Sequence, residues 1–410
     1  MNPSNSHPET QQALPSDRRR EGVQLAAVTA IGTVGAVGWA VLMRSTFWTQ
    51  LWWVGTMTLT MAGMGLVFWR FVGGWLQARW FEMVRPTCAR LAWKLVPAIW
   101  TGWVGLMIWG PSMYGVVKLK DSESLPWFWD PKFWRPASLG FVLFLLVILI
   151  ATYRTNSACQ DREAVDHKRR GGEFAFFAIL LLLLYFFVYG MFLWFFPIHP
   201  KWFSTIEPFL WMSAAAWLGI GLLHGIGIES GTPQARERAA VLRNDTGRLW
   251  IALTLLWAYM EFMQLLIVWM AGLPWETTFY AQRGRGLWRW IGWGCIGLRF
   301  LIPFLILLKV SWRIHSGWAK TLLVLGWISW NVWAGWWIHP ETEGEAALSL
   351  ILGDIGIGLV TIGWIVLPWP WGLYNRGKPD FAASPPQTRG AAAASSPQNH
   401  FVSLKPARSG

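Results

Sequence analysis

Residues 248–271 read RLWIALTLLWAYMEFMQLLIVWMA. Between Leu249 and Ala271 the only charged residue is Glu261, so the stretch exceeds the ~20 apolar residues that an α-helix needs to cross a bilayer. Stretches of the same kind recur along the whole chain. They predict ten membrane-spanning helices, at roughly residues 22–43, 50–72, 95–114, 137–154, 172–196, 205–228, 248–271, 288–309, 318–338 and 348–369.

The composition supports an all-α polytopic membrane protein. Of 410 residues, 54% are hydrophobic and 14% are charged, against ~25% charged in an ordinary soluble domain. These values exclude most soluble enzymes and also a disordered chain. The chain has 35 Trp residues, which is too many for interface belts alone, so we expect some of them to pack between helices.

The distribution of basic residues predicts the orientation of the chain. Most of the 35 Lys and Arg residues lie on the side that holds both termini. The net charge of +13 therefore reflects membrane orientation rather than binding to nucleic acid, and both termini are expected in the cytoplasm. We divide the chain into a polar N-terminal segment (1–21), a transmembrane domain (22–370) and a disordered C-terminal tail (371–410).

Ionisable residues inside a membrane are functional candidates by default. Glu261 lies ~15 Å from the outer end of its predicted helix, and Arg299 lies ~16 Å inside the next, antiparallel helix. Similar depth predicts a buried Glu261–Arg299 pair, because an unpaired charge there would be less stable. Glu261 would act either as a proton-accepting carboxylate in a relay or as half of a static pair.

Other polar residues within the spans have two interpretations each. Gln264 shares a helix face with Glu261 and would bind a quinone carbonyl or join two helices. His224, near an inner helix end, would pass protons or be solvated. Asp354 would line a polar proton or quinone site or bond a neighbouring helix. We expect Arg70 to extend to the interface and Glu207 to lie at a helix N-terminus.

Cofactor chemistry has little support in the residues of this chain. Of seven His residues, only His224 lies well inside a predicted span, which argues against a bis-His haem. No C-x-x-C motif links Cys88, Cys159 and Cys295, so no metal site is predicted. Phosphate-binding glycine loops are also absent from the sequence. We assign no catalytic residue.

Three segments resemble a known family, quinone-binding subunit 2 (the F subunit) of bacterial alternative complex III, within the NrfD/PsrC-like membrane proteins. The first is Leu255–Arg283, the second is a P-x-W-F-S-T turn at 200–205, and the third is a motif at 303–309. The matching residues are Pro200, Trp202, Ser204, Trp257, Ala258, Tyr259, Phe262, Gln264, Trp269, Leu273, Pro274, Glu276, Tyr280, Arg283, Pro303, Phe304, Leu307, Leu308 and Lys309.

The resemblance implies a fold of two four-helix bundles with two flanking helices, in a bacterial cytoplasmic membrane. It implies a multisubunit complex that oxidises quinol. The implied partners are a paralogous ten-helix subunit with the working quinol site, an iron–sulfur protein and a multihaem cytochrome c. The F subunit itself is expected to bind no haem or iron–sulfur cluster. Its expected roles are those of scaffold and proton path, with quinone as a candidate ligand.

The chain departs from the family at two positions. Leu193 precedes Trp194 where the family usually has Asp, and Glu261 stands where a small or uncharged residue is expected. We hypothesise that Glu261 replaces the missing charge from another helix. Two rival interpretations remain, an NrfD-like anchor that itself oxidises quinol for another redox enzyme and a secondary transporter. A transporter would have helices broken near the membrane midplane, and only Pro303 lies deep inside a predicted span.

Overall fold

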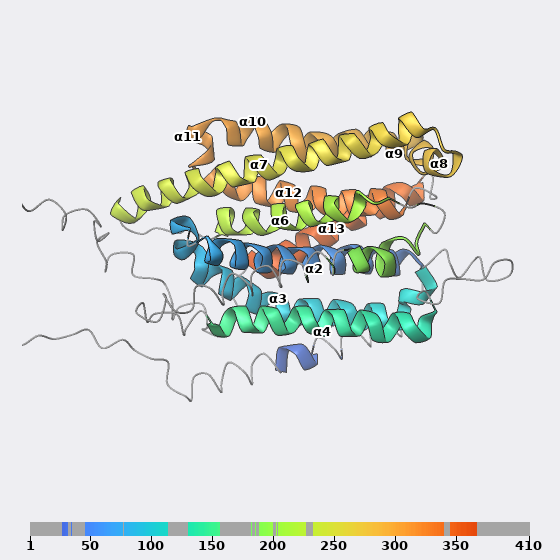
Figure 1. Cartoon of the computed structure of the whole chain (residues 1–410), viewed down its shortest axis with the longest axis horizontal. Helices are drawn as coiled ribbons and strands as arrows, with labels where there is room; N and C mark the ends of the chain where they lie inside the picture. The colour runs from blue at the N-terminus through green and yellow to red at the C-terminus, as the bar shows by residue number, and fades with distance from the viewer. Residues whose placement is uncertain are drawn as a thin grey trace, which may run out of the picture. The chain divides into compact units, whose positions relative to one another are not determined.

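The computed structural model describes residues 46–113 except 77, 130–155, 188–199, 204–226, 233–339 and 345–366, together with 27–31, 34, 182, 185 and 202. Within these residues the chain is helical (Figure 1). The elements are α2 (Thr46–Trp75), α3 (Arg79–Met113), α4 (Pro131–Thr155), η4 (Met191–Phe195), α6 (Glu207–Ile226), α7 (Pro233–Ala271), α8 (Pro274–Arg283), α9 (Gly286–Ile296), η5 (Gly297–Leu301), α10 (Ile302–Leu308), α11 (Val310–Arg313), α12 (Ser316–Ile338) and α13 (Glu345–Val366).

The helices establish an all-α multi-pass membrane protein. In the described part of the chain, seven helical stretches are long and apolar enough to span a membrane. They correspond to seven of the ten expected spans, and α12 coincides with the expected 318–338. Most of residues 22–43 and 172–196 lies outside the described residues. The number of ten, the two bundles and the sidedness therefore remain predictions.

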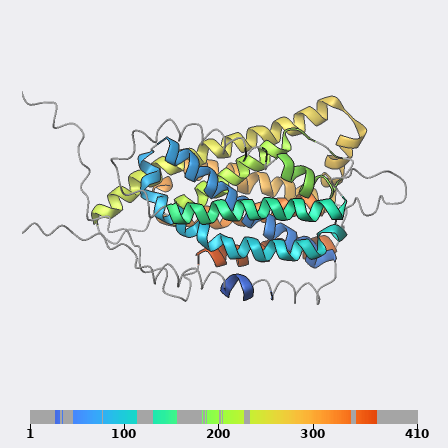
Figure 2. The ribbon, with the colours of Figure 1, turned by 60° about the horizontal axis from the view of Figure 1, so that its bottom comes forward.

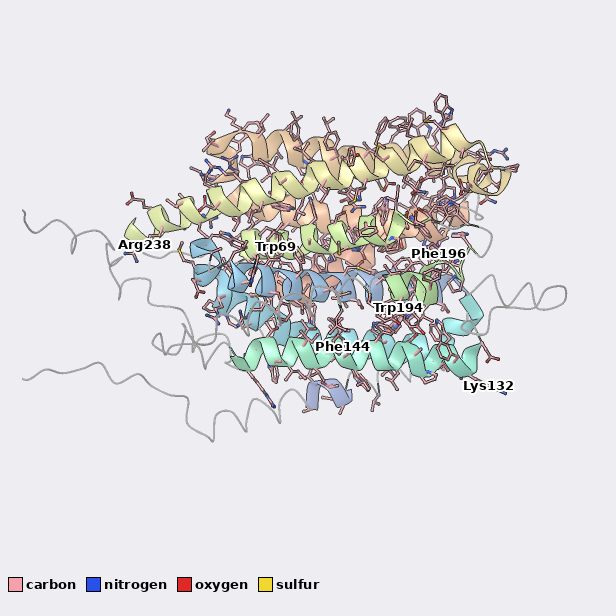
Figure 3. All side chains as sticks on the ribbon, viewed as in Figure 1. Trp69, Lys132, Phe144, Trp194, Phe196 and Arg238 are labelled. Atoms are coloured by element: carbon pink, nitrogen blue, oxygen red, sulfur yellow. The ribbon has the colours of Figure 1, made fainter. Side chains whose placement is uncertain are left out.

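Two helices begin well before the residues that hydropathy predicts. The expected spans were 95–114 and 248–271, but α3 begins at Arg79 and α7 at Pro233. Figure 3 shows Arg238 near the far end of α7. Hydropathy detects only the length that lipid must cover, whereas a helix continues through polar residues as long as its backbone hydrogen bonds form.

Helix α2 lies at the centre of the bundle and contacts α3, α4, α6, α12 and α13. It approaches the backbone of α6 closely at one point, where Gly65 and Gly219 face each other. A Cβ at Gly65 would lie 1.9 Å from the backbone oxygen of Ala215, and a Cβ at Gly219 would lie 2.5 Å from the carbonyl carbon of Gly65. Because lipid provides no hydrophobic drive between helices, such close backbone contact supplies the packing energy.

Helices α3 and α4 run side by side at the edge of this arrangement (Figures 1 and 2). The outer face of α4 carries exposed apolar side chains, among them Phe144, Leu143 and Val147. Figure 3 shows Phe144 on this helix and Trp194 on its inner side. An exposed apolar face of this kind suits contact with lipid.

Tryptophan side chains join the helices, as the sequence predicts for part of the 35. Their indole N–H groups donate to acceptors on neighbouring helices across the bundle. Trp69 donates to the carbonyl oxygen of Ala216 (2.7 Å), Trp103 to Thr60 Oγ1 (3.0 Å), Trp217 to Thr254 Oγ1 (2.9 Å) and Trp327 to Thr361 Oγ1 (2.9 Å). Each bond satisfies a polar atom that lipid could not.

Two π-helical segments lie just before prolines. Pro197 and Pro303 have no N–H, so neither can bond to the carbonyl four residues earlier. Within η4, the carbonyl of Leu193, four residues before Pro197, accepts a hydrogen bond from the Trp134 indole at 2.6 Å. In η5 the winding widens, and the N–H of Ile302 bonds to the carbonyl of Gly297. The second segment carries Arg299, one of the ionisable residues expected inside a span.

The contact between α2 and α6 leads to a stability prediction. Gly65→Ala places a methyl group against the backbone of α6, so we expect a loss of about 1–3 kcal/mol in the free energy of unfolding. The measurement is the thermal unfolding midpoint in mild detergent. Gly140→Ala is the matched control, because no atom lies within 4 Å of the added Cβ and alanine favours a helix. Equal midpoints for the two variants would contradict the prediction.

Candidate functional site

Buried ionisable residues gather in the half of the bundle that contains α8. We call this end of the helices the α8 end; it includes the start of α6, the end of α7 and the end of α12. The charges of Glu261 on α7 and Arg299 on η5 interact there. Neither residue forms a direct salt bridge within the described part of the chain, and Glu261 Oε2 and Arg299 Nη1 are buried without a hydrogen-bond partner there.

Three indole rings surround the Arg299 guanidinium. Its Cζ lies 4.0 Å from the ring centre of Trp257, 4.6 Å from that of Trp330 and 4.7 Å from that of Trp333. Arg299 is 3% exposed, so these cation–π contacts act with little screening by water. Trp257 lies one turn before Glu261 on α7, and the Trp333 side chain bonds to the Glu261 carboxyl. The aromatic cage therefore connects the cation to the acid.

A second carboxyl group, Glu207, belongs to the same cluster. It is the first residue of α6, as the sequence predicts, but it is only 2% exposed. Its Oε1 accepts a hydrogen bond from the Trp211 indole at 2.9 Å, and its charge interacts with those of Glu261 and Arg283. Two carboxylates repel in a medium of low dielectric constant, and a proton held between them removes that repulsion.

Hydroxyl and amide groups near the two carboxyl groups form a hydrogen-bonded line that ends on α8. Ser204 Oγ donates to Gln264 Oε1 at 2.6 Å, and Gln264 bonds to the side chain of Tyr280. Burial raises the pKa of Tyr280 well above its usual value, and Glu261 and Glu207 raise it further. The phenol therefore keeps its proton and remains a hydrogen-bond donor.

Arg283 fixes α8 to the end of α12. It is 1% exposed and donates to the carbonyl oxygens of Phe279 (2.8 Å), Trp336 (3.1 Å) and Trp337. Its Nη2 also lies 3.1 Å from His199 Nε2. Burial, followed by the charge of Arg283, lowers the pKa of His199 to about 3, so this imidazole is neutral beside the cation.

His224 lies at the opposite end of the bundle, and the interpretation of a solvated histidine is wrong. Its side chain is completely buried, and its Nδ1 lies 2.8 Å from Thr246 Oγ1. Thr246 Oγ1 already donates to the carbonyl of Leu242, so it accepts from His224 Nδ1. Sequence position near a helix end suggested exposure, but the long α7 covers this end of α6.

Asp354 is fully buried on α13, and His339 at the end of α12 lies next to it. Asp354 is not adjacent to Gln264 by any contact found in the described residues, so the two quinone candidates do not form one site here.

Arg70 lies over the Phe81 ring at 6.0 Å.

The residues of the resemblance are spread over this region. Trp202 stacks on Phe279, Ser204 binds Gln264, and Pro274 and Glu276 form the first turn of α8. Tyr259 is 61% exposed on the outer face of α7. Pro200 lies outside the described residues.

Sequence reasoning missed the roles of Glu207, Tyr280 and His339 and the cage formed by Trp330 and Trp333. Glu207 was recognised inside the predicted span 205–228, but it was interpreted only as a residue at a helix N-terminus and not as a neighbour of Glu261. Tyr280 and His339 lie just outside predicted spans, so the search for ionisable residues within spans passed over them. No sequence signal distinguishes two caging indoles among 35.

Comparison with known protein families finds no matching family, and no curated protein matches the chain. The resemblance of its segments to alternative complex III therefore stands on the residues alone.

The environment of His199 predicts a pH-dependent stability. In the unfolded chain a histidine takes up a proton near pH 6.5, whereas folded His199 does so only at about 3. Stability is therefore fully present above pH 6.5 and falls as the pH drops toward 3, by at most about 1.4 kcal/mol per pH unit. We expect His199→Gln to reduce the loss of unfolding temperature between pH 7 and pH 5. An unchanged loss would show that another group titrates.

Proposed function

We propose that this chain is a proton-conducting membrane subunit of a quinol-oxidising complex of the alternative complex III type. The observation that carries the proposal is the presence of two buried carboxyl groups, Glu207 and Glu261, whose charges interact with each other. Glu261 also interacts with Arg299, and Tyr280 interacts with both carboxyl groups and bonds to Gln264. Carboxyl groups inside a membrane domain are typical of proton relays. The segment resemblance supports the assignment to this type of complex.

The proposed direction of transfer follows from the distribution of charge. If the basic side of the chain is cytoplasmic, the α8 end faces outward in a bacterial cytoplasmic membrane. Glu261 and Glu207 would then exchange a proton, and Ser204, Gln264 and Tyr280 would provide hydrogen-bonding positions toward the outer surface. Arg299 would balance the negative charge of Glu261 whenever this carboxyl group has released its proton.

Glu261 also explains how the chain tolerates its departure from the family pattern. Leu193 is completely buried in the hydrophobic core, so no charge is available at that position. Glu261 supplies a carboxyl group from α7 instead. The role of the chain in the complex would be that of scaffold and proton path, with haem c and iron–sulfur clusters in partner subunits and with quinone as a candidate ligand.

The first experiment tests the assignment to a complex. Purification of the full chain from its native membrane in mild detergent, followed by mass spectrometry and a haem stain, should yield a multihaem cytochrome c, an iron–sulfur protein and a second ten-helix subunit. If the chain purifies alone or only with a molybdenum enzyme, the assignment is wrong and the NrfD-like anchor takes its place.

The second experiment tests the proton path. We expect Glu261→Gln to lower proton release per electron in the reconstituted complex, with a loss of about tenfold or more in the rate of transfer through this site. Glu237→Gln is the matched control, because Glu237 is exposed at the other end of the same helix. Unchanged proton release in an intact Glu261→Gln complex would refute the path.

A further inference from the structure

His339 and Asp354 face each other inside the bundle, apart from the carboxyl pair described above. His339 caps the end of α12, and Asp354 lies within α13. His339 Nε2 is 3.5 Å from Asp354 Oδ1, and both side chains are 0% exposed. That separation permits charge interaction but is long for a hydrogen bond.

Apart from the weak 3.5 Å contact between His339 and Asp354, the four polar atoms of the two side chains have no hydrogen-bond partner within the described part of the chain. Buried polar atoms in proteins nearly always have such partners, and the requirement is stricter where lipid replaces water. A simple ion pair would leave Nδ1 and Oδ2 unsatisfied. The two side chains therefore need an additional partner that both donates and accepts hydrogen bonds.

Gly335 makes room for the pair. A Cβ at this position would lie 1.8 Å from Asp354 Oδ2 and 3.1 Å from His339 Cδ2. The absence of a side chain one turn before His339 thus lets the carboxyl group lie directly against the backbone of α12. The same glycine sets the approach of α12 and α13 at this point, so the pair depends on the local backbone as well as on its own two residues.

The surroundings of the pair contain few other titratable groups. From α12 the facing group is His339 itself, and from α9 it is Cys295, whose thiol interacts with the charges of both Asp354 and Glu261. Trp288, also on α9, lies 6.1 Å from the His339 ring. From α2, apolar Leu51 contacts the neighbouring Gly353. No compensating cation other than His339 contacts Asp354 among the described residues.

We propose that His339 and Asp354 form a second proton-binding site, served by buried water and separate from Glu207 and Glu261. A water molecule can accept from an imidazole N–H and donate to a carboxylate oxygen, which satisfies both residues. A proton then passes from the imidazole nitrogen to the water oxygen while the water gives one of its protons to the carboxylate oxygen. The pair has no net charge before or after this step.

This neutrality explains why the bundle tolerates the pair. Removing one member from a buried pair leaves the other as an uncompensated group, whereas moving the proton within the pair does not. The site requires no quinol and no partner subunit, so it stands whether or not the proposed function is correct.

Infrared spectroscopy of the full chain in lipid nanodiscs tests the proposal. We expect a carboxylic acid C=O band that is absent in Asp354→Asn and shifts when H₂O is replaced by D₂O. His339→Phe should move the band and change the pH at which it disappears, because the imidazole no longer shares the proton. Glu261→Gln serves as the control and should leave this band in place, since Glu261 belongs to the other cluster.

Two results would overturn the proposal. An Asp354 side chain that stays ionised over the whole accessible pH range would be half of a static ion pair. If Asp354 is protonated but its band does not shift in D₂O, its proton does not exchange with water, and no buried water serves the site. If Asp354→Asn does not fold, the band is assigned in the otherwise unchanged chain by labelling aspartate with a heavy carbon isotope, and the same two results decide. Either result leaves the complex and the Glu261 path untouched.

Discussion

The absence of water from the lipid phase is the constraint on which the rest of this structure depends. A polar atom that faces lipid has no partner, so each one must find its partner inside the bundle. Several tryptophan side chains of the bundle help to meet this requirement. An indole ring buries a large apolar surface and still offers one N–H donor. It can therefore pack against apolar side chains and donate one hydrogen bond at the same time. Thr60, Thr254 and Thr361 provide hydroxyl acceptors for three such donors.

A tryptophan side chain also satisfies a backbone carbonyl group that a proline leaves without its helical hydrogen bond. Pro197 frees the carbonyl of Leu193, and the Trp134 indole from α4 binds that carbonyl. Pro303 is accompanied by a wider winding in η5, which changes the angular position of the residues just before it. Arg299 lies on that segment and meets its three indoles there. A defect in hydrogen bonding thus coincides with the placement of Arg299, the cation in the aromatic cage.

The sequence predicted those features of the fold that depend on hydropathy and on residue spacing along a single helix. Long apolar stretches located seven spanning helices and the position of α12. Helix depth indicated that Glu261 and Arg299 would interact, but among the described residues the two form no direct salt bridge. The remaining site depends on which helix faces which. The approach of Glu207 to Glu261, or of His339 to Asp354, is decided by the packing of α6, α7, α12 and α13. That packing in turn rests on single glycines such as Gly65 and Gly335.

The charges at the α8 end also limit how the site can change. Glu207 and Glu261 are acidic, Arg283 and Arg299 are basic, and the four interact in a medium where separated charges are unstable. Arg283 is bound by backbone carbonyl oxygens and Arg299 by aromatic rings, so neither cation depends on a carboxylate to hold its position. In the proposed proton path, the cations would stay in place while a carboxyl group gains or loses a proton, because no ion pair would have to break. A rigid cation beside an acid that makes few bonds is the arrangement in which proton exchange requires the least structural change.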